Sequence, residues 1–546
     1  MPNKTKYIFV SGGVISGLGK GITAASIALL LKARGLKVAP VKCDAYMNVD
    51  AGTIRPQEHG EVFVSDDGVE SDQDIGTYER FIDENLKRSN YVTNGQIYQE
   101  IIRKERSFEY NGEDVEIVPH VPEEMIRRFK QAGKEKKADV VIIEVGGTVG
   151  EYQNVLFIEA NRIMKYRDHE DVIHIHVGYL PTPGFLGEMK SKPVQTSVRI
   201  LSGTGIQPDF IIGRSEKSID EQRKERIAWL CNIDRENVIS NPDVDTIYRV
   251  PMIFKEQNID KKILKKLHLK GQKQDLKEWS KLVKKIGKFK NKVNITVVGK
   301  YTKVGDYNLS DAYVSVVESI KHASWNNDLE PEITWIDAEE IEKKGIVLLE
   351  NAQCIIVPGG FGNRGIEGKI AAAQYARTNN IPYLGLCLGL QIAVIEFARH
   401  VCNLKNANST EMDPKTKHPV IHIMPEQEKL LEGKNYGGTM RLGAYPCVLQ
   451  NSSKTYKLYQ QKTISERHRH RYEVNNSYRK QMEKAGLIFS GTSPNELLVE
   501  IIEIPTHPYF IASQFHPEFK SRLNRPHPLF DGLIKAAIEK TKNIKN

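Results

Sequence analysis

Short apolar runs alternate with longer amphipathic stretches through roughly the first half of the chain. Because uninterrupted apolar runs between helices are typical of strands buried on both faces, this pattern predicts a parallel α/β sheet. In such sheets ligands bind at the carboxyl ends of the strands. We expect residues 1–265 to form one doubly wound domain, with strands at residues 7–10, 37–43, 140–145, 172–177 and 209–212.

A second α/β series begins at Val293, with apolar runs in NITVVGK, ITWIDA, QCIIVPGG and IPYLGLC. It predicts a second doubly wound domain over residues 293–546. Between the domains, residues 266–292 carry apolar side chains at helical spacing with lysines on the other faces: Leu276, Trp279, Leu282 and Ile286. We interpret this segment as a basic amphipathic linker helix lying on one domain. A helix lying on a membrane surface has the same pattern, but that is less expected in the middle of a chain.

The net charge of +9 is concentrated in one segment. Residues 261–292 hold thirteen lysines against Asp275 and Glu278, a surplus larger than that of the whole chain. The basicity therefore belongs to the linker and not to the folded domains, which argues against nucleic acid as a partner.

Nothing in the sequence suggests a membrane or secretory protein. No apolar run approaches the roughly 18 residues of a membrane span, and Met1 leads into a strand without a signal-peptide pattern. The six cysteines contain no C-x-x-C pair, which is typical of a reducing compartment. These features predict a cytoplasmic protein without a membrane partner.

The stretch SGGVISGLGKGITAAS, residues 11–26, joins the first strand to an apolar helix at about residues 22–31. Its glycines leave the backbone N–H groups free to surround a phosphate, and the helix N-terminus points at the same place. Lys20 adds a cation suited to phosphate oxygens. The combination predicts a P-loop, although a glycine-rich turn in an ordinary βα unit is the alternative.

Two departures from the usual P-loop motif affect the metal. Val14 stands where the first glycine is usual, and Gly21 replaces the serine or threonine that binds Mg²⁺. Carboxylates from elsewhere would have to replace that hydroxyl group. Asp72 and Asp74 would face one side of an extended segment, and Glu144 ends an apolar strand near the P-loop. A solvated acidic loop and a helix-capping carboxylate are the respective alternatives.

Cations gather in GEMKSKPVQTSVR, residues 187–199. Lys190, Lys192 and Arg199 on a Gly/Pro-containing loop suit a second anionic ligand. A surface charge cluster is the usual alternative.

The second domain contains a G-x-C-x-G sequence, Gly385 to Gly389, between a strand and the helix 391–398. This is a nucleophile elbow, whose sharp turn exposes the side chain of Cys387 at a helix N-terminus that favours the thiolate. The flanking glycines argue against a merely structural cysteine. Pro358 to Gly362 could supply oxyanion-binding N–H groups, and His516 with Glu518 could complete a triad.

The RHRHRYEVNN stretch, residues 467–476, could suggest a metal through His468 and His470. The interleaved arginines instead favour a strand that faces carboxylates or other anions.

These motifs together resemble the CTP synthase family along nearly the whole chain. GGVISGLGKGI, NVDAGTIRPQEHGEVFV, GTYERF, EVGGTVG and KSKPVQ are similar to its synthetase domain. PGGFG, the cysteine elbow and HPE are similar to class I glutamine amidotransferases, and NANSTE (406–411), GGTMRLG (437–443) and RHRHRYEVNN also match the family. The resemblance implies an α/β fold of two doubly wound domains, an N-terminal P-loop-like parallel sheet and a C-terminal class I glutamine amidotransferase domain.

The resemblance implies a ligase reaction in two halves. ATP phosphorylates O4 of UTP, and ammonia released from L-glutamine by the second domain displaces the phosphate to give CTP. The family also implies GTP as an activator, CTP as a feedback inhibitor and a homotetramer.

The resemblance implies site residues as well. The catalytic residues would be Cys387, His516, Glu518 and Lys20; the ATP contacts Gly17, Leu18, Gly19, Lys20, Gly21, Ile22 and Asp74; and the Mg²⁺ ligands Asp74 and Glu144. The UTP or CTP contacts would be Ser16, Glu151, Tyr152, Gln153, Lys190, Ser191, Lys192, Pro193, Val194, Gln195 and Arg226. The glutamine contacts would be Gly360, Leu388, Gly389, Leu390, Gln391, Glu411 and Arg471.

The chain departs from the family pattern at the product site. Gly150-Glu151-Tyr152-Gln153 replaces the family's G-D-I-E, and Arg226 stands where lysine is common. Two other functions fit parts of the sequence. One is a P-loop amidotransferase that acts on a carboxylate, against which KSKPVQ and TIRPQEHGEVFV argue. The other is a partitioning-type regulatory ATPase that uses its basic linker on DNA or lipid, against which the Cys-His-Glu set argues.

Overall fold

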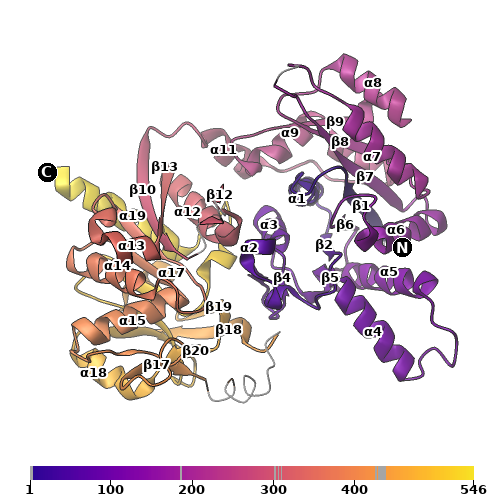
Figure 1. Cartoon of the computed structure of the whole chain (residues 1–546). Coiled ribbons are helices and arrows are strands. Elements are labelled where there is room, and N and C mark those ends of the chain that lie inside the picture. The colour runs from indigo at the N-terminus through magenta and orange to yellow at the C-terminus, as the bar shows by residue number, and fades with distance from the viewer. Residues whose placement is uncertain are drawn as a thin grey trace. The chain divides into compact units, whose positions relative to one another are not determined.

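The computed structural model describes residues 4–184, 187–300, 303–304, 307–308, 310–424, 427 and 438–545. The chain forms two compact units (Figure 1). The first contains Met1–Ala51 and Asp74–Val283, and the second contains Gly52–Gln73 and Lys284–Asn546. The segment 52–73 thus lies with the C-terminal unit, whereas a division by sequence order keeps it with residues 1–265.

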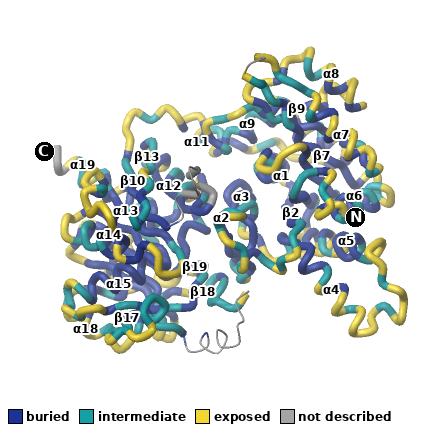
Figure 2. Tube along the Cα trace, in the orientation of Figure 1, coloured by how far each residue is buried: buried dark blue, intermediate teal, exposed yellow. Residues whose placement is uncertain are grey.

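The first unit is built on a parallel sheet with the strand order β5-β2-β6-β1-β7-β8-β9. Successive residues of β1 face opposite sides, and both sides are covered by helices, so its interior positions are fully buried (Figure 2). The strands are β1 Lys6–Gly12, β2 Val38–Asp44, β5 Tyr91–Thr93, β6 Val140–Val145, β7 Val172–Leu180, β8 Phe210–Ser215 and β9 Val238–Pro242. The helices are α1 Lys20–Lys32, α3 Gln73–Ile82, α4 Asn94–Arg106, α5 Ile117–Lys136, α6 Val155–Arg167, α7 Lys192–Gly203, α8 Glu221–Cys231, α9 Val250–Glu256 and α10 Ile259–Lys266.

The predicted doubly wound sheet is confirmed, and each of the predicted strands is present as β1, β2, β6, β7 or β8. The edge strands β5 and β9 escaped prediction. β5 has only three residues, and β9 contains the polar pair Ser240 and Asn241, so neither has a distinct apolar run.

The second unit is built on a mixed sheet with the order β13-β10-β14-β15-β23-β22-β21-β18-β19. The strands from β13 to β23 are parallel, and those from β22 to β19 pair antiparallel. The strands are β10 Asn291–Gly299, β13 Leu329–Asp337, β14 Cys354–Val357, β15 Tyr383–Leu386, β18 Arg441–Leu449, β19 Thr463–His470, β21 Ile488–Thr492, β22 Val499–Glu503 and β23 Phe510–Ser513. The helices include α12 Val314–Asn326, α13 Ala338–Lys344, α14 Ile366–Thr378, α15 Leu388–His400, α17 Lys454–Tyr459, α18 Arg479–Lys484 and α19 Pro528–Lys545. A smaller sheet joins β16 Asn408–Ser409, β17 Pro419–Ile423 and β20 Tyr472–Val474. The parallel half was expected from the sequence, and the antiparallel half was not.

The segment 52–73 forms α2 Pro56–His59 and the hairpin of β3 Phe63–Val64 with β4 Glu70–Ser71. Charged contacts attach the segment to the second unit. The Asp66 carboxylate accepts from Arg467 Nε at 2.5 Å, and Glu70 accepts from Arg469 Nε at 2.7 Å. The ring of Phe63 meets that of Phe519 edge-on at 4.9 Å. Because Arg467 is fully buried, these contacts make the segment part of the C-terminal core.

The predicted linker helix is α11, Lys277–Lys285, shorter than the basic segment that contains it. Trp279 packs against Phe81 and Tyr248, and its Nε1 donates to the Tyr248 carbonyl at 3.0 Å. The apolar face of the helix is therefore used within the first unit, as the amphipathic pattern predicts. Among the residues that the structure describes, no helix is long and apolar enough to cross a membrane.

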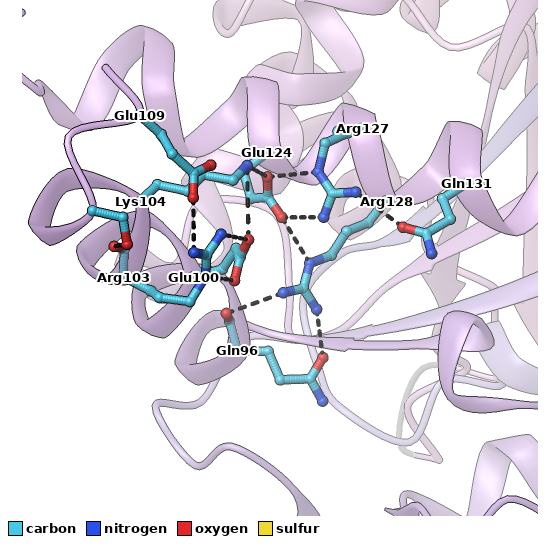
Figure 3. Close-up of polar contacts among 10 residues, drawn as sticks. Gln96, Glu100, Arg103, Lys104, Glu109, Glu124, Arg127, Arg128 and Gln131 are labelled. Atoms are coloured by element: carbon cyan, nitrogen blue, oxygen red, sulfur yellow. Dashed lines mark hydrogen bonds and ion pairs between the residues drawn. The ribbon is translucent and has the colours of Figure 1, made fainter. Parts of the chain in front are cut away.

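A buried carboxylate ties α4 to α5 in the first unit (Figure 3). Glu124 on α5 accepts from Lys104 of α4 at 2.7 Å, and from Arg127 and Arg128 of its own helix at 2.6 and 3.1 Å. Burial alone would raise the pKa of this carboxyl group. The surrounding cations outweigh burial and lower the pKa from 4.5 to about 2.

We predict that Glu124→Gln lowers the free energy of unfolding by about 2 kcal/mol at neutral pH, because three cations lose a charged acceptor. The folded-state pKa is depressed, so the stabilisation is present above the ordinary value of 4.5 and is lost as the pH falls toward 2. Thermal unfolding at pH 7 and pH 3 measures it. Glu109→Gln is the control, since Glu109 pairs with Arg103 at the surface. Equal melting temperatures for wild type and Glu124→Gln at pH 7 would contradict the prediction.

Candidate active sites

The glycine loop joins β1 to α1 in the conformation that a P-loop needs. Gly17 and Gly19 have φ of 70° and 92°, which side chains rarely allow. Val14, in place of the usual glycine, has φ of 82°, a strained value for a β-branched residue. Lys20 begins α1, and its Nζ donates to the Gly147 carbonyl at 2.8 Å. Burial lowers the pKa of Lys20, so an anionic ligand would favour its charged form.

The structure explains why glycine occupies position 21. A Cβ atom there would lie 2.1 Å from Asp74 Oδ1, so serine or threonine at this position would require the Asp74 carboxylate to move. Asp74 lies in the first turn of α3, and not in the extended segment with Asp72 that the sequence analysis assumed. The expected extended conformation of residues 72–74 is therefore wrong, because α3 begins at Gln73.

Asp74 and Glu144 share one cation. Lys42 Nζ contacts the Asp74 carboxylate and lies 3.2 Å from Glu144 Oε1. The Tyr78 hydroxyl donates to the other oxygen of Glu144. Burial, followed by the charge of Asp74, raises the pKa of Glu144. Two carboxylates that repel each other beside a phosphate loop form a hard-oxygen donor set that suits Mg²⁺.

The cation loop leads into α7. Ser191 precedes the helix, Pro193 occupies its first turn, and Gln195 Nε2 donates to Ser191 Oγ at 2.8 Å. Ser191 and Arg226 line one cavity of about 460 Å³ together with Glu188, Met189, Gln222, Arg223, Glu225 and Trp229. The structure thus brings together two predicted nucleotide contacts that are far apart in the sequence.

Other predicted contacts of the nucleotide lie elsewhere in this unit. Lys190 pairs with Glu188 at 2.6 Å, and Val194 is buried inside α7. Glu151 accepts from the Thr148 hydroxyl at 2.5 Å, whereas the Tyr152 side chain is 98% exposed. The structure therefore does not place Tyr152 in the 460 Å³ cavity.

Cys387 lies at a sharp turn between β15 and α15, with φ of 50°. Both flanking glycines are required by close backbone contacts. A Cβ on Gly385 would lie 2.6 Å from the Gly389 carbonyl, and one on Gly389 would lie 2.1 Å from the Val357 carbonyl. The G-x-C-x-G pattern is thus the packing requirement of an elbow. The Cys387 Sγ atom lies 3.6 Å from Gln514 Nε2, which can donate to it.

His516 and Glu518 lie beside the cysteine. His516 Nδ1 is 2.7 Å from Glu518 Oε1. Burial opposes the imidazolium, but Glu518 and Cys387 outweigh it and raise the pKa of His516 to about 10. The arrangement favours the protonated form of the His516 ring beside the Cys387 sulfur. Gly359 is close enough that a Cβ would lie 2.9 Å from the His516 ring, so the PGGFG loop borders the triad.

A cavity of about 210 Å³ opens on the thiol. The Glu411 carboxylate accepts from the Gly362 N–H at 3.1 Å, and Arg471 is held by Gln427 at 2.6 Å and Thr439 at 2.9 Å. The cavity therefore offers both an anion and a cation to a ligand. It is lined by Gly360, Phe361, Cys387, Leu388, Gln391, Glu411, His470, Arg471 and Tyr472.

Most of the predicted glutamine contacts gather in this cavity, but Gly389 and Leu390 do not line it. Both lie inside the elbow, where Leu390 belongs to the hydrophobic core. Phe361, Thr439, His470 and Tyr472 lie in motifs that the sequence analysis singled out, but none of them was predicted as a glutamine contact. Gln427, which supports Arg471, belongs to no such motif, so nothing local signalled it. Of the motif 437–443, Gly437 lies outside the described residues.

The RHRHR strand faces carboxylates, as its arginines suggested. His468 Nε2 lies 2.7 Å from Glu500 Oε2. The other carboxylate oxygen of Glu500, Oε1, lies 2.8 Å from Arg441 Nη2. The carbonyl of Arg469 lies 3.7 Å from the Cys387 Sγ atom. The strand thus supports the thiol site through paired charges.

Both units match known families in sequence. Residues 6–269 match the model described as CTP synthase N-terminus, and residues 308–536 match that of glutamine amidotransferase class-I. A CTP synthase of Caldanaerobacter subterraneus subsp. tengcongensis is 52% identical over 98% of this chain and 98% of its own length. The chain belongs to the CTP synthase family.

Other members of the family agree. CTP synthase of Bacillus subtilis is 50% identical over 98% of this chain and 99% of its own length. A solved structure of the Trypanosoma brucei CTPS glutaminase domain with bound acivicin is 40% identical, covering 45% of this chain and 94% of that chain, with a TM-score of 0.42. The chain thus matches both family models, and it spans 98% and 99% of the lengths of these two curated relatives.

Proposed function

We propose that this protein converts UTP to CTP, using ATP and ammonia taken from L-glutamine. Full-length similarity to CTP synthases supports the proposal. The observation that carries it is the presence in one chain of a phosphate loop with an acid pair and of a Cys-His-Glu arrangement in a cavity. Either site alone would fit many enzymes, because function follows from sites and not from folds.

In the synthetase unit, the N–H groups of residues 17–22 and the Lys20 ammonium group bind the phosphates of ATP. Residues 190–195, which lead into and begin α7, and Arg226 bind UTP, whose O4 attacks the γ-phosphorus and releases ADP. Lys20 stabilises the charge that develops on the transferred group. Asp74 and Glu144 would hold Mg²⁺, which would neutralise charge on the phosphate oxygens when bound.

In the glutaminase unit, the Cys387 thiolate attacks the side-chain amide carbon of glutamine. The N–H groups of Gly360 and Leu388 face the developing oxyanion. His516 donates its proton to the departing nitrogen, which leaves as ammonia, and then takes a proton from the water that cleaves the thioester. Glu518 fixes the imidazole. Arg471 binds the α-carboxylate of the substrate, and Glu411 binds its α-ammonium group.

A second, smaller cavity borders the triad and shares Gly360 and Phe361 with the glutamine cavity. This cavity of about 70 Å³ lies against Gly359, His516 and Glu518. Its other wall includes Pro56, Glu61 and Val62 from the segment 52–73. We assign this space to the first part of the ammonia path, because it lies against Gly359, His516 and Glu518 of the proposed glutaminase site.

Family membership also supports regulation and assembly as proposals: activation by GTP, inhibition by CTP, a homotetramer and a cytoplasmic location. The altered segment 150–153 and Arg226 lie at the predicted product contacts.

The reaction is tested by mixing the purified protein with UTP, ATP, Mg²⁺ and glutamine and following CTP absorbance. We expect CTP to form with glutamine or with ammonium chloride, and only when ATP is present. Omitting UTP is the control for ATP consumption by another route. Glutamine- and ATP-dependent amination of a carboxylate, with no CTP from UTP, would contradict the proposal.

A further inference from the structure

A buried chain of hydrogen bonds crosses the first unit behind the phosphate loop. It starts on α6, passes through β7 and β1, and ends in the first turn of α7. Each of its side chains is at most 2% exposed. The successive contacts are Asn161 Nδ2 to His174 Nδ1, His174 Nε2 to Ser11 Oγ (2.7 Å), Ser11 Oγ to His176 Nδ1 (3.0 Å), His176 Nε2 to Ser197 Oγ (2.9 Å) and Ser197 Oγ to the Val194 carbonyl (3.0 Å).

The last bond fixes the direction of the others. The Val194 carbonyl can only accept, so the Ser197 hydroxyl gives its one proton to it. Ser197 Oγ must then accept from His176 Nε2–H, which leaves His176 Nδ1 as an acceptor for the Ser11 hydroxyl. Ser11 Oγ in turn accepts from Nε2–H of His174. When both imidazoles are neutral, this order of donors and acceptors holds each ring in one tautomer.

The electrostatics agree with this assignment. Burial lowers the pKa of His174 well below its ordinary value, and burial with the nearby Lys20 lowers that of His176 to about 3. A proton added to either ring would replace an acceptor by a donor and break one bond of the chain. The chain is thus a fixed structural connection at physiological pH and not a proton relay.

The chain joins the two loops assigned to nucleotides. Ser11 directly precedes the phosphate loop, whereas Val194 and Ser197 lie in α7, which continues from the cation loop. Gly13 packs against the hydrogen-bonded pair of His176 and Ser197. A Cβ atom at Gly13 would lie 2.2 Å from Ser197 Cβ and 3.1 Å from His176 Nε2. The backbone N–H of Gly13 also donates to the Val177 carbonyl of β7 at 3.1 Å. The phosphate loop is therefore seated on the His176–Ser197 pair.

We propose that His176 is a positioning residue that sets the distance between the phosphate loop and the UTP-binding start of α7. It acts through Ser11 on one side and Ser197 on the other, and it touches neither nucleotide. The inference rests on the proposed function, in which a phosphoryl group passes between ligands of these two loops. Misplacement of about 1 Å between reacting groups can cost about 10²-fold in rate, so a missing link in this chain should slow transfer.

Two amide replacements separate the two halves of the imidazole. In His176→Gln the side-chain amide can still donate to Ser197 from the Nε2 position. In His176→Asn the shorter side chain can still accept from Ser11 but cannot reach Ser197. We expect His176→Asn to lower ammonia-dependent CTP formation about 10-fold or more and to raise KM for UTP more than KM for ATP. We expect His176→Gln to keep most of the activity.

Ser197→Ala removes the same bond from the α7 side and is the matched variant. Because both substitutions break the same hydrogen bond, the double variant His176→Asn/Ser197→Ala should lose little more activity than either single variant. Glutamine hydrolysis at saturating glutamine and the melting temperature report on folding. If His176→Asn does not fold, the KM split in Ser197→Ala tests the same bond.

The outcomes are distinct. A wild-type protein that makes no CTP from ammonia overturns the proposed function and this inference with it. Wild-type CTP formation with unchanged kinetics in His176→Asn and Ser197→Ala overturns the inference alone. Equal losses in the Gln and Asn variants that follow the melting temperature, with KM for UTP unchanged, also overturn it, because they indicate a role in folding only.

Discussion

Cys387→Ala should abolish CTP formation from glutamine and leave formation from added ammonia close to wild type. The thiolate is needed only to open the glutamine amide through a thioester. In the proposed function, His516 serves the same step, with its Nδ1 atom 2.7 Å from Glu518 Oε1. Free ammonia bypasses the step and reaches the same phosphorylated UTP. We expect the glutamine-dependent rate to fall by at least about 10²-fold.

Lys20→Ala is the matched variant in the other unit. The Lys20 ammonium group stands at the start of α1 and is needed for phosphoryl transfer whichever nitrogen source follows. It should therefore cripple both rates while glutamine hydrolysis persists. CTP absorbance is followed for each of the two variants, once with glutamine and once with ammonium chloride at alkaline pH. Loss of both activities in a folded Cys387→Ala protein would contradict the two-site description and place the thiol in the synthetase chemistry.

Asp74→Asn and Glu144→Gln should each lower ATP-dependent CTP formation about 10²-fold or more, with either nitrogen source. Asp74 Oδ1 lies beside Gly21, which replaces the usual P-loop serine or threonine, and Glu144 shares Lys42 with Asp74. Each neutral amide removes a negative charge from the donor set and offers an N–H₂ group to the cation.

The measurement is the CTP rate as a function of Mg²⁺ concentration. We expect both variants to need more Mg²⁺ than wild type, whereas Cys387→Ala assayed with ammonia keeps the wild-type requirement. Near-normal turnover of both variants at low Mg²⁺ would show that these carboxylates are not metal ligands. The Mg²⁺ dependence also separates two roles of these carboxylates. A loss of CTP formation that no Mg²⁺ concentration restores indicates a role in phosphoryl transfer and not in metal affinity.

Local patterns were enough to predict the elements that position both sites. The apolar run at residues 7–10 and the helix that follows the glycines define the phosphate loop, since each depends on neighbours in sequence. The elbow at Cys387 was predictable because its pattern of strand, G-x-C-x-G and helix is contiguous in the sequence, although Gly389 is also required by the Val357 carbonyl of the neighbouring strand.

Features that depend on distant residues were not predictable. The role of Gly21 is set by Asp74, which arrives from α3, and nothing near Gly21 in the sequence signals it. Val14 has a left-handed φ, a conformation that β-branched residues rarely adopt and that a sequence pattern therefore does not predict. Likewise the pairs Arg467–Asp66 and Arg469–Glu70 join residues about 400 positions apart, so no periodic pattern in the sequence predicts these ion pairs.

The placement of segment 52–73 also affects the order in which the protein becomes native during synthesis. The segment leaves the ribosome early, but Arg467, the partner of Asp66, follows 401 residues later. At translation rates of about 5–20 residues per second this interval is roughly 20–80 s. During that time the first unit can close around β1 while the hairpin of β3 and β4, with Phe63 at its start, has no partner. The C-terminal unit is therefore completed by residues 52–73, which are synthesised before the rest of that unit.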